Sequence, residues 1–128
     1  MKEPKWLTIT MVVAIHDEQL AIHGGLPGLR DAGMLESALD RPRNKSAYET
    51  PELPELAAAY AYAIARNHPF ADGNKRTSLL ALYTFLGINE IDFVVPEASA
   101  AAMILSLAAG EVSEESLARW IRDNWPKA

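Results

Sequence analysis

The chain contains no cysteine and no long apolar run, and each absence excludes a kind of protein. Without cysteine it has no disulfides, thiolate zinc sites or cysteine nucleophiles. The most apolar later stretch, Leu56–Ala65, is about half as long as a membrane-spanning helix. The N-terminal stretch Trp6–Ile15 is interrupted by threonines and has no small-residue cleavage site after it, so it is not a signal peptide. The sequence therefore predicts a soluble, cytoplasmic protein with no membrane partner.

The sequence also lacks an excess of basic charge. Twelve basic and seventeen acidic residues give a net charge of −5. A general nucleic-acid binder needs a positive surface that contacts phosphates, so direct nucleic-acid binding is not expected. With 128 residues, of which 49% are hydrophobic, the chain fits one globular domain over residues 1–128.

Helical periodicity dominates the chain. Thr8, Asp31, Asn74 and Ser113 are typical helix caps, and glycine or proline follows most of the apolar stretches. These signals predict helices over 9–23, 32–39, 54–67, 75–86, 96–109 and 114–125. Residues 41–51, with two prolines, are expected to form a loop, and residues 91–95 a short extended piece. The predicted fold class is all-α, one compact domain of about six helices.

Two of these helices are predicted to form the centre of the domain. The helix ending near Asn67 is rich in alanine, which permits close approach of a neighbouring helix. The helix ending near Leu86 is apolar around most of its circumference, as is typical of a buried helix.

The loop between these two helices, His68–Thr77, collects most of the reactive side chains. Gly73 allows backbone conformations that are closed to other residues. Asn74, Lys75 and Arg76 lie where the next helix begins, and free N–H groups with the positive end of the helix dipole favour an anion there. Arg76 can hold phosphate oxygens through two parallel N–H groups.

His68 and Asp72 complete the chemistry of this loop. Asp72 repels a phosphate unless a divalent cation lies between them, which favours Mg²⁺ bound through this carboxylate, substrate phosphates and water. His68 can accept the proton of an attacking hydroxyl because its ordinary pKa is close to neutral. A base, a metal ligand and a phosphate cradle are the parts that phosphoryl or nucleotidyl transfer requires.

Each of these signals is weak when taken alone. A histidine before proline is usually a loop residue, Asp-Gly is a common turn, asparagine is a common cap, and Lys-Arg is usually a solvated pair. Phe70 is interpreted as a core residue that anchors the loop. The functional interpretation depends on the joint occurrence of these residues in one short segment.

The segment His68–Arg76, with the sequence HPFADGNKR, resembles the signature of the Fic/Doc superfamily, and specifically of its Doc (death-on-curing) branch. His16-Asp17, the GGLPG segment at Gly24–Gly28 and Gly110-Glu111 also look Doc-like. The resemblance implies an all-helical fold with this loop and the helix after it at the centre. It also implies that His68 is the base, Asp72 the Mg²⁺ ligand, and residues 73–76 the groups that hold the phosphates of ATP.

The Doc branch differs from Fic enzymes in the group that it transfers. Fic enzymes resemble this chain but usually carry glycine at the position of Lys75 and arginine at that of Leu79, and they transfer AMP to a hydroxyl. In the Doc branch this position is lysine, as here, and the resemblance implies that the nucleotide binds in the reversed orientation. Its γ-phosphate is then transferred to a threonine of elongation factor Tu, which stops translation and growth. Pro69 and Gly73 are nearer the Fic form, so AMP transfer stays open as an alternative.

The resemblance also implies a toxin–antitoxin system. Doc proteins are toxins neutralised by a small Phd-type antitoxin. Contact with operator DNA is expected only through this antitoxin. Some Fic proteins instead carry an internal inhibitory Ser/Thr-x-x-x-Glu-Gly/Asn motif, which this sequence lacks. Inhibition by a helix of the antitoxin in a groove is therefore expected. A catalytically weak corepressor that only binds its antitoxin is a further alternative, disfavoured by the intact His68, Asp72 and Arg76.

Overall fold

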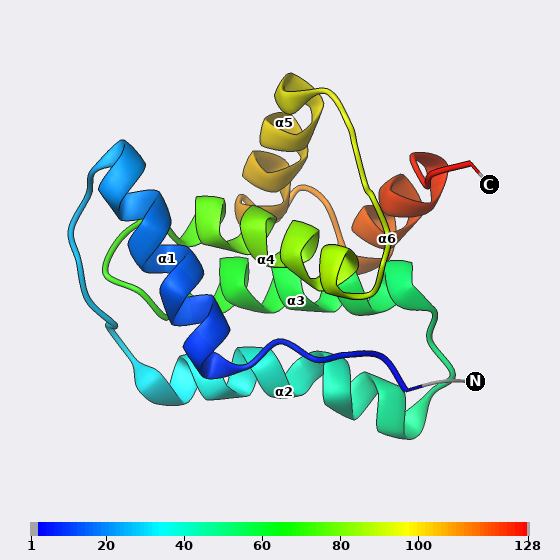
Figure 1. The fold of residues 1–128 in the computed structure, drawn as a ribbon, viewed down its shortest axis with the longest axis horizontal. Coiled ribbons are helices and arrows are strands. Elements are labelled where there is room, and N and C mark those ends of the chain that lie inside the picture. The colour runs from blue at the N-terminus through cyan, green and yellow to red at the C-terminus, as the bar shows by residue number, and fades with distance from the viewer. Residues whose placement is uncertain (1–2, 128) are drawn as a thin grey trace.

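The structure is a computed structural model that describes residues 3–127, and these residues form six helices and no strand. The helices are α1 (Ile9–His23), α2 (Ala32–Tyr48), α3 (Leu53–Asn67), α4 (Asn74–Ile88), α5 (Glu97–Ala108) and α6 (Glu114–Asp123). Helices α3 and α4 lie side by side at the centre, α2 packs along α3, and α1 crosses α4 (Figure 1). The predicted all-α fold class is confirmed.

Most predicted helix boundaries agree with the structure. The Thr8 hydroxyl accepts a hydrogen bond from the Met11 N–H, 3.2 Å away, and Ser113 caps α6 in the same way. Glu52 and Glu55 form a capping box at the start of α3. At its other end α6 is shorter than predicted, since it ends before Trp125.

Helix α2 differs from the prediction, because it does not end before Pro42. It continues to Tyr48, so most of the predicted loop over 41–51 is helical. Proline inside a helix removes one hydrogen bond and costs about 3 kcal/mol. Here Leu35, Ala38, Leu39 and Pro42 form one buried face of α2, which packs against α3. Burial of that face offsets the cost of the proline.

Both ends of helix α4 differ from the prediction. Asn74 is the first residue of α4 and not its cap; Gly73 occupies the cap position in a left-handed conformation, with φ of 77°. Helix α4 also continues through Gly87 to Ile88. Residues 91–95, which are predicted to be a short extended piece, have neither helix nor paired-strand structure.

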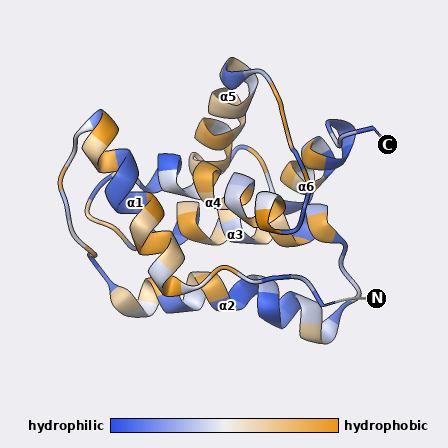
Figure 2. Ribbon diagram, in the orientation of Figure 1, coloured by the Kyte–Doolittle hydropathy of each residue, from blue (hydrophilic) through white to orange (hydrophobic). Residues whose placement is uncertain are grey.

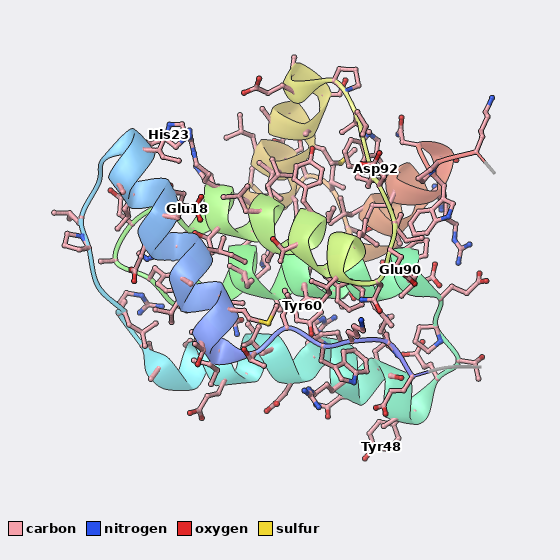
Figure 3. All side chains as sticks on the ribbon, viewed as in Figure 1. Glu18, His23, Tyr48, Tyr60, Glu90 and Asp92 are labelled. Carbon is pink, nitrogen blue, oxygen red and sulfur yellow. The ribbon has the colours of Figure 1, made fainter. Side chains whose placement is uncertain are left out.

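The core is centred on α3 and α4 and also takes in buried apolar side chains from the other four helices; apolar segments occur along every helix in Figure 2. Tyr60 of α3 lies in its middle, in contact with Phe85, and its hydroxyl accepts a hydrogen bond from the Leu7 N–H, 3.0 Å away (Figure 3). Leu79 and Leu80 of α4 are only half-buried, so this helix is less completely enclosed than its sequence predicts. Among residues 3–127, no helix combines the length and hydropathy needed to cross a membrane.

Candidate functional site

The site is built around the connection from α3 to α4, which lies beside α1 and the α1–α2 connection (Figure 1). Two residues in the left-handed backbone region delimit this connection. His68 ends α3 with φ of 48°, and Gly73 begins α4. Phe70 is buried between them, as the sequence predicts.

The α1–α2 connection holds the loop through its backbone. Leu29 and Phe70 form an isolated antiparallel bridge. The Ala71 N–H donates to the Gly28 carbonyl at 3.0 Å, and the Arg30 N–H donates to the Pro69 carbonyl at 2.7 Å. The loop is therefore fixed by a segment about forty residues earlier in the chain.

The side chain of Arg30 adds a contact that the sequence analysis missed. Its Nε donates to the His68 carbonyl at 2.7 Å and its Nη2 to the Asn67 carbonyl at 2.9 Å. A cation at the carbonyl end of a helix also interacts favourably with the helix dipole. Arg30 thus fixes the backbone of His68, while the His68 side chain remains exposed at a cavity.

Asp72 is oriented by two backbone donors. Its Oδ1 accepts from the Gly73 N–H at 2.8 Å, and its Oδ2 accepts from the Leu26 N–H at 3.2 Å. Each carboxylate oxygen can accept a second interaction, so the oriented group can still bind a cation. The described residues include no cluster of three acidic or histidine side chains suited to a metal. A single oriented carboxylate is the kind of protein ligand that Mg²⁺ takes together with phosphate and water oxygens.

The start of α4 provides the positive end of the site. No side chain caps this helix, so its first N–H groups remain available for an anion. Lys75 and Arg76 are exposed at this end and line the cavity. Asn74 is buried, and its amide binds the backbone N–H and carbonyl of Phe70, at 3.0 and 2.9 Å. Of the polar groups of Asn74, therefore, the main-chain N–H is the one that remains to contact a phosphate.

One cavity of about 1070 Å³ brings the predicted site residues together. His68, Asp72, Gly73, Lys75 and Arg76 line its polar part. It continues between α1, α4 and α5 as an apolar groove, lined by Ile15, Ile22, Leu79, Leu80, Tyr83, Ile104 and Leu105.

Tyr83 is a polar group within this apolar groove. Burial raises the pKa of Tyr83, and the negative charge of Glu97 raises it further. Its hydroxyl therefore stays protonated near neutral pH and can donate a hydrogen bond to a bound molecule.

One helix N-terminus of this compact helical scaffold presents a histidine, a carboxylate and two cations, a set of groups suited to a transferase. The sequence matches the model of the Fic/DOC family over residues 6–86, and the chain belongs to this family. It is 39% identical over 113 residues to "Protein kinase doc" of Escherichia phage P1, covering 87% of this chain and 88% of the relative. It is 44% identical over 72 residues to "Toxin Doc" of Mycolicibacterium smegmatis, covering 53% of this chain and 54% of the relative. These relatives place it in the Doc branch and identify it as a toxin of this family.

Proposed function

We propose that the protein is a toxin kinase that transfers the γ-phosphoryl group of ATP to a threonine of elongation factor Tu in the cytoplasm and thereby inhibits translation. The observation that carries the proposal is the shared cavity. It joins an exposed histidine, an oriented carboxylate and two cations at an uncapped helix N-terminus. The printed name of the phage relative, a protein kinase, supports the same reaction.

The residues divide the reaction between them. The hydroxyl oxygen of the target attacks the γ-phosphorus, the bond from that phosphorus to the oxygen bridging to the β-phosphate breaks, and ADP leaves. His68 accepts the hydroxyl proton. Lys75, Arg76 and the first N–H groups of α4 hold the phosphate oxygens and neutralise their charge. A Mg²⁺ ion at Asp72, when bound, supplies further neutralisation of the phosphates.

Lys75 and Leu79 favour phosphoryl transfer over AMP transfer. Lys75 places a long cationic side chain where the resembling Fic enzymes have glycine, and this fills space that a phosphate group otherwise uses. Leu79 lines the cavity with an apolar side chain where those enzymes have a second arginine. Both differences remove parts of the AMP-transferring site.

The groove between α1, α4 and α5 supports an antitoxin as the inhibitory partner. It is continuous with the polar part of the cavity and is mainly lined by apolar side chains. An amphipathic helix of a Phd-type antitoxin fits such a groove and blocks access to the loop. The name of the mycobacterial relative, a toxin, supports the presence of such a partner.

The decisive experiment incubates the protein and elongation factor Tu with Mg²⁺ and ATP labelled at either the α- or the γ-phosphate. Label on the factor from the γ-position only is expected. Label from the α-position establishes AMP transfer instead. His68→Ala and Asp72→Asn should both abolish labelling, whereas Asp92→Asn, which removes an exposed carboxylate (Figure 3) that does not line the cavity, should not.

A further inference from the structure

His16 of α1 contacts the loop although it lies far from it in the sequence. Its side chain is 1% exposed. Its ring is stacked on Phe70, with ring centroids 3.8 Å apart and an angle of 8° between the planes. Its Nε2 lies 2.8 Å from the main-chain oxygen of Asp72. Two loop residues on either side of Ala71 are therefore held by one side chain.

The hydrogen bond defines which ring nitrogen carries the proton. A main-chain carbonyl only accepts hydrogen bonds, so Nε2 of His16 must be the donor. The other nitrogen, Nδ1, lies 3.7 Å from Oδ1 of the exposed Asp17. His16 thus provides a directed N–H group, which a purely apolar core residue does not provide.

The Asp72 carbonyl belongs to the same peptide unit as the Gly73 N–H. This N–H donates to Oδ1 of Asp72, so its direction helps to set that of the carboxylate. Because a peptide unit is planar, holding its oxygen also fixes its N–H. His16 therefore acts on the Asp72 carboxylate through one rigid peptide unit.

We infer that His16 is a positioning residue for the transfer reaction, one that orients Asp72 and the start of α4 without contacting the substrate. The inference rests on the proposed function for its catalytic consequence. The orientation of the peptide unit itself is a separate property of the folded protein. A histidine that served only to fill the core would be replaceable by another aromatic ring.

Two substitutions separate the stacking of His16 from its hydrogen bond. His16→Phe keeps a ring on Phe70 and removes the donor. His16→Gln removes the ring and retains an N–H donor. With γ-labelled ATP, we expect kcat to fall about 10- to 100-fold in His16→Phe, the range seen when groups that orient a site are removed. The KM for the target protein should stay within about twofold, and His16→Gln should recover part of the lost kcat.

A second measurement does not depend on activity. In ¹⁵N-labelled protein, hydrogen exchange of the Gly73 amide should accelerate in His16→Phe and be partly restored in His16→Gln, with unchanged helical circular dichroism. Unchanged exchange and kcat in His16→Phe overturn the inference. If the wild-type protein transfers no phosphate but Gly73 exchange responds as expected, the proposed function fails and the positioning of the peptide unit stands. If the kinase is active and Gly73 exchange is unchanged, the positioning role fails alone.

Discussion

The side-chain amide of Gln19 occupies the space next to Gly73 in which any other residue would place its Cβ. A Cβ built on Gly73 lies 2.1 Å from Nε2 of Gln19, far inside van der Waals contact. Gln19 is itself buried, and Gly73 has a left-handed φ of 77°. The backbone conformation therefore favours glycine at the position where the loop enters α4, and any larger residue would also have to displace the end of the Gln19 side chain.

Gly73→Ala should destabilise the protein and reduce its activity. The left-handed conformation alone costs a non-glycine residue about 1 kcal/mol, and the clash with Gln19 adds to this. Gln19→Ala in the same chain should remove the clash and leave only the conformational cost. Urea unfolding of the two single variants and the double variant measures the coupling. If the effects of the two substitutions are additive, the contact between these residues does not explain the glycine.

Arg30→Ala should lower activity more than stability. The guanidinium is exposed, so its two hydrogen bonds to the His68 and Asn67 carbonyls are expected to contribute only about 1 kcal/mol to stability. Their loss frees the backbone of the proposed base, and kcat should fall at least tenfold. Arg119→Ala, which removes an exposed arginine from α6, is the matched control. Equal kcat values for the two variants contradict a role of Arg30 in positioning His68.

The fold was more predictable than the packing around the loop. Helix caps such as Thr8 and Ser113 act within a few residues of their own position, so the sequence shows them directly. Pro42 was misread as a helix end because its cost is local, whereas the burial that offsets it comes from α3. The position of a proline therefore predicts a helix end only where the helix is not held by neighbouring elements.

The site residues that are close together in the sequence were also predictable, whereas those that act through distant contacts were not. His68, Asp72, Lys75 and Arg76 are contiguous enough to be recognised together, and the structure brings them to one cavity. Arg30 has no distinguishing sequence pattern, because its partners lie nearly forty residues away. Asn74 does bind backbone groups, as a helix cap does. Its amide, however, forms hydrogen bonds with the N–H and carbonyl of Phe70 in the loop and not with the N–H groups at the start of the helix.

Stability should fall above about pH 10 in part because of Tyr60. Burial raises the pKa of Tyr60 above its ordinary value of 10.0. The folded state therefore keeps the proton that the unfolded state loses, and this contribution is complete below pH 10 and is lost as the pH rises through the folded pKa. Urea unfolding from pH 8 to 11 should show a shallower decline in Tyr60→Phe. That variant should also be about 1 kcal/mol less stable at pH 8, because the Leu7 N–H loses its acceptor. Identical slopes for both proteins rule out Tyr60 as a source of the decline.

Glu114 should support stability and not catalysis. Its buried carboxylate begins α6, accepts hydrogen bonds from the guanidinium of Arg41, and lies 3.7 Å from the Lys45 ammonium group of α2. Glu114→Gln should reduce the free energy of unfolding by about 1–3 kcal/mol. This loss is smaller than that for a fully buried ion pair, because Arg41 is half exposed. Glu115→Gln, an exposed neighbour, should change it by less than about 0.5 kcal/mol. A loss of kcat in Glu114→Gln at a temperature where it is fully folded contradicts a purely structural role.

The double substitution of Lys75→Gly and Leu79→Arg tests which residues determine whether a phosphoryl group or AMP is transferred. Both positions line the cavity, and Leu79 is only half-buried, so an arginine there can reach the cavity without displacing the core. Glycine opens space for a phosphate and arginine supplies a second guanidinium that can hold it. Transfer of γ-label should fall at least tenfold, and α-label should begin to appear on the target protein. The matched control combines Lys5→Gly with Leu53→Arg, which alters an exposed lysine and a half-buried leucine that do not line this cavity. If the double substitution abolishes γ-transfer without any retained α-label, Lys75 and Leu79 take part in binding ATP but do not determine its orientation.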